Sequence, residues 1–423
     1  MSNVRLIPQI YFPGNNTTFG IQQVLNKLRQ SANEVLSYIQ TSSSGGGICI
    51  PNNTWANEVD AIVLGIPSLV PTSILVGTNP TDLQTAINNL ISGGVLQVNT
   101  NAVYSPIQIP ANKPMTIKAG DGFNPVITGT NGIRLLDQAH DVTISGITLD
   151  QCSTGDSNAL GSAICLDHLA VVNRIIFYNV SITNVINGSG VMLSYHQSIS
   201  GDDYAKPNVF PTEFSNRLAF VNCAFFHGGV EGTEGANLSM RGIYLAYVNK
   251  CVVDGDNADS RGIQFQNCIN YLCQDCVSHG FNGPSQNNDA YKSDEMDGSG
   301  TYPVPPYKTS GTHRRCVAYD CVTGFNIEDW CSGYLTQCEA YNCSFEAFHL
   351  GYCSYPGSPT LYTIGTMECC KGYNSATGTF VQIGVSDFLR WNNMYNNTSI
   401  PIWTQDYNMA NSAPLDSSNV NIP

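Results

Sequence analysis

A five-residue pattern of apolar and polar positions recurs along the middle and C-terminal parts of the chain. In each copy a small residue precedes an apolar one, a variable one, usually a second apolar one, and another variable one. This alternation is the periodicity of a β-strand with two different faces. Because the copies keep one phase, they predict stacked parallel strands with one column of side chains inside and one outside. The nine copies begin at Gly132, Ala163, Gly190, Gly242, Gly262, Ala290, Gly324, Ala347 and Thr379.

The segment before the repeats predicts a cap for this stack. Residues 81–91 form an amphipathic helical pattern with one apolar face, and Gly93-Gly94 ends it before a short strand over 95–98. The first rung of a solenoid exposes its apolar interior and its unpaired backbone, so this helix is well placed to cover it. The apolar face consists of Leu83, Ile87, Leu90 and Ile91.

Changes in the hydrophobic pattern and in composition along the chain predict four regions. Residues 1–47 are an N-terminal attachment segment with a helix and a Ser/Gly linker, 48–80 an adaptor or neck, 81–385 the β-helix and 386–423 a C-terminal cap. The helix carries a heptad seam, which favours a self-associating coiled coil, expected as a trimer, over a helix lying on its own domain. The seam residues are Ile21, Leu25, Leu28, Ala32, Val35 and Ile39.

Charge and composition exclude several classes of partner. The 423 residues carry a net charge of −14 with only 18 Lys and Arg, which argues against nucleic acid and against an anionic membrane surface. No stretch approaches the roughly 18 apolar residues of a membrane span. The first residues lack the apolar core of a signal peptide, so we expect no export by the general secretory route.

The cysteine spacing follows the repeat. Cys316 and Cys338 are 22 residues apart, as are two further pairs among the 16 cysteines, and one rung of a β-helix takes about that length. We interpret these residues as free thiols packed in stacked positions. Cys273-x-x-Cys276 resembles half of a zinc site, but no second pair with a nearby histidine completes it, so we expect no metal there.

The outward positions of adjacent copies carry the charged and polar side chains that could bind or cleave a ligand. Neighbouring rungs lie about 4.8 Å apart, so residues far apart in sequence converge on one patch. Amide and carboxylate groups suit sugar hydroxyls and an aromatic face suits the sugar ring, which predicts a glycan-binding groove. The alternative is an ordinary solvated sheet face. The patch comprises Lys292, Asp294, Asn326, Glu328 and His349, with Tyr244, Gln264 and Gln266 beside it.

Two cleavage chemistries are open for this patch. Hydrolysis would use Asp294 and Glu328 as an acid and a second carboxylate. Elimination from a uronic acid would use Lys292 or His349 as the base, with a cation to neutralise the substrate carboxylate. That cation could be Arg314, Arg315 or Ca²⁺, although the acidic turns at 254–259 and 294–298 match no calcium loop, and we expect no cofactor.

A family resemblance supports this architecture. The helix, the Gly-Gly pair and the strand ending at Ala119-Gly120 resemble the opening of pectate-lyase-like right-handed parallel β-helices, in particular those of bacteriophage tailspikes and glycan depolymerases. The resemblance covers residues 81–385. It implies a right-handed coil of three-sheet rungs and, for tailspikes, a homotrimer with an N-terminal particle-attachment region.

A second, looser resemblance is to a calcium-dependent pectate lyase family over Asn288–Asn326. Asp289 and Tyr291 match that family, but its basic lysine would fall at Asp294, and Val322-Thr323 replace its paired aspartates. The lyase mechanism is therefore not carried over.

The sequence thus favours a viral tailspike or receptor-binding protein that binds a host cell-surface polysaccharide, with depolymerisation left open. Its expected partners are that glycan, two further copies of itself, and other virion tail proteins through the N-terminal segment. The first alternative is a free-standing polysaccharide lyase or glycoside hydrolase, which the heptad neck and the missing signal peptide disfavour. The second is a non-catalytic structural or adhesive virion fibre, which only an activity measurement would distinguish.

Overall fold

The computed structural model divides the chain into two units, Met1–Asn52 and Asn53–Pro423. The predicted heptad helix and linker lie outside the described residues, so both stay predictions. The described residues are 54–153, 161–166, 170–186, 189–194, 217–227, 236–256, 259–266, 268–284, 288–294, 309–328, 331–351, 364–382, 389–390, 392–395, 397, 400–405 and 420–422.

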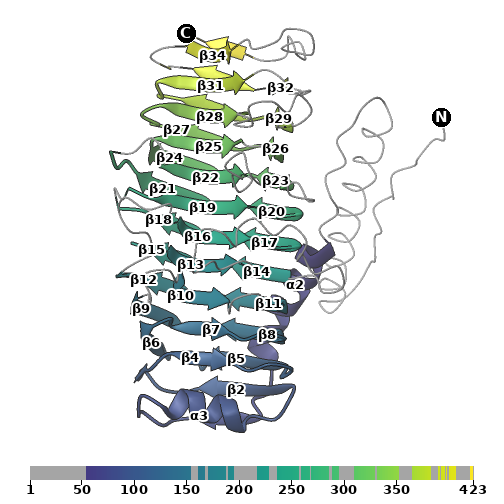
Figure 1. Cartoon of the computed structure of the whole chain (residues 1–423), viewed down its shortest axis with the longest axis vertical. Coiled ribbons are helices and arrows are strands. Elements are labelled where there is room, and N and C mark those ends of the chain that lie inside the picture. The colour runs from purple at the N-terminus through teal and green to yellow at the C-terminus, as the bar shows by residue number, and fades with distance from the viewer. Residues whose placement is uncertain are drawn as a thin grey trace, which may run out of the picture. The chain divides into compact units, whose positions relative to one another are not determined.

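The second unit is a solenoid of three parallel sheets, here called sheets A, B and C (Figure 1). In the described residues sheets A and B have 12 strands each and sheet C has 11. Each rung contributes one strand to each sheet, and every pairing is parallel between adjacent rungs, as in β22 with β19 and β25. This confirms the all-β parallel β-helix predicted from the repeated pattern.

Sheet A contains β1 (Ser73–Leu75), β2 (Gly94–Val98), β5 (Met115–Ala119), β8 (His140–Ser145), β11 (Asn173–Tyr178), β14 (Arg217–Val221), β17 (Leu245–Asn249), β20 (Asn270–Gln274), β23 (Ser310–Arg314), β26 (Ser332–Thr336), β29 (Ile364–Glu368) and β32 (Leu389–Arg390). Sheet B contains β3 (Val103–Tyr104), β6 (Val126–Thr130), β9 (Thr148–Ser153), β12 (Ser181–Thr183), β15 (Ala224–Phe226), β18 (Val252–Asp254), β21 (Val277–Phe281), β24 (Val317–Cys321), β27 (Glu339–Tyr341), β30 (Lys371–Tyr373), β33 (Asn393–Tyr395) and β35 (Val420–Ile422). Sheet C contains β4 (Ile107–Ile109), β7 (Ile133–Leu135), β10 (Gly161–Leu166), β13 (Ser189–Ser194), β16 (Ala236–Arg241), β19 (Arg261–Gln266), β22 (Asp289–Asp294), β25 (Thr323–Ile327), β28 (Glu346–Leu350), β31 (Thr377–Gln382) and β34 (Ile400–Gln405).

The core is one continuous column of apolar side chains from Leu83 to Met394. Because successive rungs keep the same register, aromatic rings stack along the axis. The ring centroids of Tyr291 and Phe325 are 4.6 Å apart and those of Phe325 and Phe348 are 5.3 Å apart, with nearly parallel ring planes. Such offset stacks add to the burial of large apolar surface. The repeated apolar positions therefore form the interior, as the pattern predicted.

Two of the nine pattern copies were assigned wrongly. Gly242 has a φ of 65° and lies in the turn after β16, and the residues that follow enter sheet A rather than sheet C. The sheet C strand of that rung is β16, where Leu238 and Met240 are buried. The last copy is shifted by one residue, because Thr379 pairs with the inward-facing Phe348.

The ends of the solenoid show how the flanking segments are used. Helix α3 (Asp82–Asn89) caps the first rung, as predicted, and Leu83, Ile87 and Leu90 join the core (Figure 1). Ile91, expected on the same face, is 66% exposed because it follows the end of the helix. At the other end β34 and β35 continue sheets C and B beyond residue 385.

Residues 54–75, within the expected neck, pack against sheet A or join it. Helix α2 (Thr54–Gly65) is followed by the short 3-10 helix η1 (Ile66–Ser68), and β1 pairs with β2. Trp55 is buried on the outer face of sheet A and its Nε1 donates to the Leu218 carbonyl at 3.1 Å. No helix in the described ranges is long and apolar enough to cross a membrane.

One tyrosine hydroxyl links α2 to sheet A. Tyr247 Oη donates to Asp60 Oδ1 at 3.0 Å and accepts hydrogen bonds from Asn249 and Gln274 at 2.7 and 3.0 Å. Tyr247→Phe removes all three hydrogen bonds at a buried position, so we expect a loss of about 1–3 kcal/mol in the free energy of unfolding. Denaturant unfolding measures it, and the exposed Tyr244→Phe serves as the control. Equal unfolding curves for the two variants would contradict this assignment.

Candidate functional site

The outer face of sheet C brings most of the expected residues together. In the strand register Gln264 pairs with Lys292, Lys292 with Asn326, and Asn326 with His349. A second column contains Gln266 and Asp294, which are also register partners. Glu328 continues this column, since its backbone N–H donates to the Ser293 carbonyl at 3.0 Å. The placement inferred from the repeated pattern is therefore correct for these seven residues.

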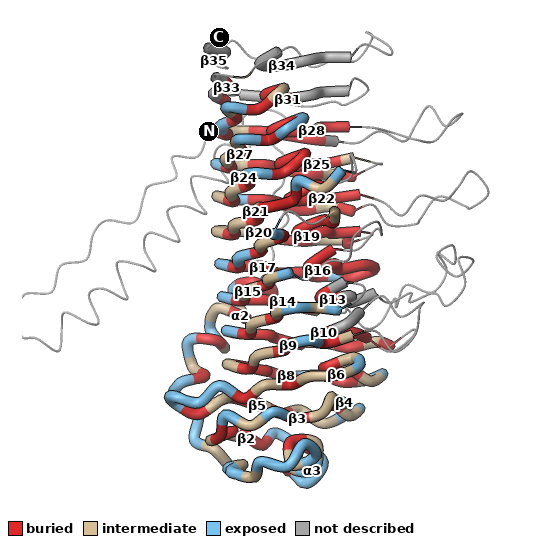
Figure 2. Tube along the Cα trace, turned by 90° about the vertical axis from the view of Figure 1, so that its left-hand side faces the viewer, coloured by how far each residue is buried: buried red, intermediate tan, exposed pale blue. Residues whose placement is uncertain are grey.

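Lys292 lies at the centre of a buried cluster of carboxylates. Its Nζ lies 3.6 Å from Asp294 Oδ2 and 3.9 Å from Asp289 Oδ2, and it is in direct contact with Glu328 Oε1. The side chains of Lys292 and Asp294 are only 6% exposed, and that of Glu328 is 16% exposed. Figure 2 shows this buried stretch along β19, β22 and β25. Buried charges of this kind are rare unless they are paired. Here the Lys292 ammonium lies beside all three acids, and Arg261 Nε lies 3.9 Å from Asp289 Oδ2.

The surroundings separate the pKa values of the acids. Burial raises the pKa of Asp294, and it raises the pKa of Asp289 to about 6 despite the opposing charge of Lys292. Burial would also raise the pKa of Glu328, but the Lys292 ammonium holds it below its usual range. Burial by itself would lower the pKa of Lys292, but the three carboxylates raise it. Compared with ordinary carboxyl groups, the surroundings thus favour the protonated form of Asp294 and the ionised form of Glu328, and they keep Lys292 charged.

The raised pKa of Asp289 predicts a pH-dependent stability. The folded state binds the proton more tightly than the unfolded state, so this residue makes stability fall as the pH rises from about 4 to about 6, by up to about 1.4 kcal/mol per pH unit. Asp289→Asn should remove this part of the slope, whereas the exposed Asp121→Asn should keep it. Urea unfolding at several pH values measures the slope, and equal slopes for wild type and Asp289→Asn would refute the burial effect.

Four buried oxygen atoms of this face have no hydrogen-bond donor within the described part of the chain: Gln266 Oε1, Asp289 Oδ1, Asp294 Oδ1 and Asn326 Oδ1. Buried acceptors are normally satisfied, and each one left unpaired is costly. The four acceptors are concentrated on three adjacent rungs, on β19, β22 and β25.

Further polar residues of this face were missed from the sequence. Arg241 Nη2 donates to Gln264 Oε1 at 3.4 Å, and its Nε donates to Ser239 Oγ at 3.1 Å. Glu346 Oε2 lies 2.6 Å from His349 Nδ1 and, against the effect of burial, raises the pKa of the imidazole. Arg261, Asp289 and Glu346 all stand one position before a repeated copy. Examining that position would have revealed this charged column.

Three expected residues do not join the cluster. Tyr244 is 43% exposed in the turn before β17, so the patch receives no aromatic face from it. Arg314 is exposed at the end of β23 in sheet A. Arg315 lies at the corner between sheets A and B, where it forms a two-pronged ion pair with Asp275. The expectation failed because Tyr244 precedes a sheet A strand, Arg314 ends one and Arg315 follows one, on another side of the rung from sheet C.

The expectation that the acidic turns at 254–259 and 294–298 hold no calcium ion stays a prediction. Asp254 Oδ1 lies 3.7 Å from His279 Nδ1, and Asp256 Oδ2 lies 3.3 Å from His227 Nδ1. Most of the turn at 294–298 lies outside the described residues. A separate surface cavity of about 450 Å³ lies near the N-terminal end of the solenoid, and none of the expected site residues lines it.

Comparisons with known proteins are informative at the level of the fold. No protein-family model and no curated protein matches the chain. Among solved structures, the A-module of the mannuronan C-5 epimerase AlgE4 from Azotobacter vinelandii is similar with a TM-score of 0.51 and 8% identity, over 82% of this chain and 92% of that chain.

Two further structures have lower scores. The pectate lyase Pel9A has a TM-score of 0.46 and 12% identity, over 84% of this chain and 81% of that chain. Tailspike protein 3 of bacteriophage CBA120 has a TM-score of 0.32 and 10% identity, over 82% of this chain and 59% of that chain. The chain thus has the fold of the pectate-lyase-like right-handed parallel β-helices that its opening segment resembles.

Proposed function

We propose that the outer face of sheet C binds a polysaccharide of a host cell surface, and that the chain is the receptor-binding part of a viral tail. The observation that carries the binding proposal is the set of four buried oxygen acceptors on β19, β22 and β25 for which the described residues provide no donor. Sugar hydroxyls are donors, and a polysaccharide presents them at regular intervals along an extended chain. A row of acceptors on successive rungs suits such a ligand.

Glycoside hydrolysis is the cleavage chemistry that the charge states favour. A glycosidase needs one protonated carboxyl and one carboxylate, and the environment separates the pKa values of Asp294 and Glu328 in these directions. Elimination with Lys292 as the base is disfavoured, because its raised pKa keeps the ammonium protonated. His349 would contribute through its pairing with Glu346.

The virion role, the homotrimer and the contacts with other tail proteins are parts of the same proposal. They rest on the heptad seam between residues 21 and 39 and on the linker that follows it. Sedimentation of the full chain tests the assembly, with three copies expected and a monomeric mass contradicting it.

Binding and cleavage can be separated in one set of measurements. The full chain is incubated with capsular and lipopolysaccharide preparations, and both retained glycan and new reducing ends are measured. Gln266→Leu removes one acceptor and should weaken binding by about tenfold, about 1.4 kcal/mol. Gln108→Leu, at the exposed middle position of strand β4 in the same sheet, is the matched control. Equal binding by the two variants would reject the proposed face.

The double variant Asp294→Asn/Glu328→Gln tests the chemistry. Loss of new reducing ends with binding retained supports hydrolysis. An unsaturated product, seen as ultraviolet absorbance, would instead establish elimination. Binding by the wild type without any cleavage would leave the adhesive fibre as the function.

A further inference from the structure

We propose that Cys273, Cys276 and Cys316 bind a thiophilic d¹⁰ cation, Zn²⁺ or Cu⁺, at the corner between sheets A and B. Their three Sγ atoms all lie within 4.8 Å of one another, and the three residues are buried. Cys273 Sγ and Cys316 Sγ are 3.8 Å apart. Two sulfurs on one zinc ion at about 2.3 Å, in tetrahedral geometry, are separated by about this distance. The sequence offered two of these thiols, and the fold adds the third from the next rung.

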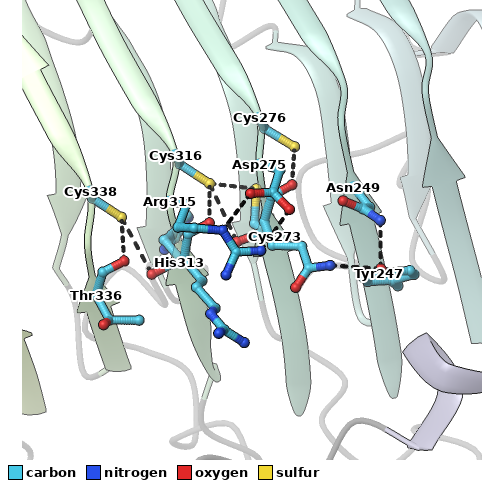
Figure 3. A network of polar contacts seen from close by, with 12 residues as sticks. Tyr247, Asn249, Cys273, Asp275, Cys276, His313, Arg315, Cys316, Thr336 and Cys338 are labelled. Atoms are coloured by element: carbon cyan, nitrogen blue, oxygen red, sulfur yellow. Dashed lines mark hydrogen bonds and ion pairs between the residues drawn. The ribbon is translucent and has the colours of Figure 1, made fainter. Parts of the chain in front are cut away.

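The backbone brings the three sulfurs together. Cys273 points inward from β20, whereas Cys276 and Cys316 each follow a left-handed turn residue, Asp275 with a φ of 53° and Arg315 with a φ of 52°. The Arg315 guanidinium clamps these two turns, with Nε 2.6 Å from Asp275 Oδ1 and Nη2 2.7 Å from Asp275 Oδ2 (Figure 3). Such two-pronged pairs fix geometry, so the clamp holds the thiols of adjacent rungs in position from outside the core.

Ordinary packing explains the neighbouring cysteines better than it explains Cys276. Cysteines at this corner form a ladder in which a thiol donates to a carbonyl of the preceding rung, as Cys338 does to His313 O at 3.4 Å and Cys370 to Leu335 O at 3.5 Å. Cys276 donates to Gln274 O, two residues back, at 3.1 Å, as Cys338 and Cys370 also do to Thr336 O and Glu368 O. It differs in that its sulfur accepts the Cys251 N–H at 3.4 Å.

His313 distinguishes the two ions. It is the register partner of Cys273 and is fully buried, and its Nε2 has no hydrogen-bond partner among the described residues. Structural zinc takes four ligands, so Zn²⁺ would need this imidazole after a side-chain rotation. Cu⁺ is stable with sulfur ligands in lower coordination and would not need it.

The test measures the metal retained by the full chain. Protein is produced in medium supplemented with zinc or with copper, dialysed against a chelator, and analysed by elemental mass spectrometry. We expect about one ion per wild-type chain and a loss of about tenfold or more in Cys316→Ser. The serine hydroxyl can keep the hydrogen bond to the Cys273 carbonyl, which the thiol makes at 3.3 Å. Cys321→Ser is the matched control, because Cys321 stacks on Cys343 alone at 3.6 Å.

A His313 variant and a Cd²⁺ titration distinguish the two ions and provide a second readout. If His313→Phe loses zinc, the zinc site includes His313 as its fourth ligand. If the same variant keeps copper, the copper ion is held by the three thiols alone. Titration of reduced wild-type protein with Cd²⁺, followed by thiolate charge-transfer absorbance, gives a second readout if Cys316→Ser does not fold. Wild-type protein without bound metal and without a Cd²⁺ signal, or equal metal in Cys316→Ser and Cys321→Ser, would overturn the proposal.

Discussion

Replacing Lys292 by methionine is expected to lower the free energy of unfolding by about 3–5 kcal/mol at pH 7, because it leaves uncompensated charge in a buried site. Asp289, Asp294 and Glu328 share this ammonium, and their side chains are 1%, 6% and 16% exposed. Methionine is similar in length and fills the same space, so the loss measures charge rather than a cavity. Denaturant unfolding followed by circular dichroism gives the value.

The pH dependence makes this prediction specific. Without the ammonium the carboxylates take up protons at higher pH, so the destabilisation should shrink as the pH falls toward 4. Lys371→Met on β30, where the lysine is exposed, is the control and should change stability by less than about 0.5 kcal/mol. If Lys292→Met lowers the free energy of unfolding no more than the control does, or lowers it more at low pH, Lys292 does not compensate the charge of the three carboxylates.

Truncating Phe325 to alanine is expected to cost about 3–5 kcal/mol. Its ring is fully buried and is stacked between Tyr291 and Phe348, so the substitution opens a cavity in the middle of the solenoid. Phe345, which is 47% exposed, is the matched control, and its substitution by alanine should cost far less. Thermal and denaturant unfolding of the two variants measure the difference. Similar losses would contradict the stacked interior.

The fold was predictable because the solenoid repeats one physical requirement. Each rung must bury residues at alternating positions, so Ile133, Ile164, Ile263 and Phe325 mark strands β7, β10, β19 and β25 of sheet C. The errors arose where a strand departs from the repeated pattern: Asn237 precedes the first apolar residue of β16 where other copies have a small residue, and Thr379 stands at an inward position. Strand β16 alternates Leu238 and Met240 with buried polar groups, and the apolar alternation beginning at Gly242 was read in its place.

Only those residues of the candidate site whose position follows from the strand register could be predicted from the sequence. Reading the outward positions placed Lys292, Asn326 and His349 in one column, although they are far apart in sequence. The sequence could not show that Arg315 follows a sheet A strand and pairs with Asp275, because that depends on the length of each rung. It also could not place Cys316 beside Cys273 and Cys276, since that contact requires the fold of two adjacent turns.

The most direct test of glycan binding on sheet C is hydrogen–deuterium exchange of the full chain with and without the polysaccharide that it retains. The account predicts increased protection in β19, β22 and β25, with sheet B unchanged. Protection confined to sheet B, or to the cavity near residues 118–124, would contradict it.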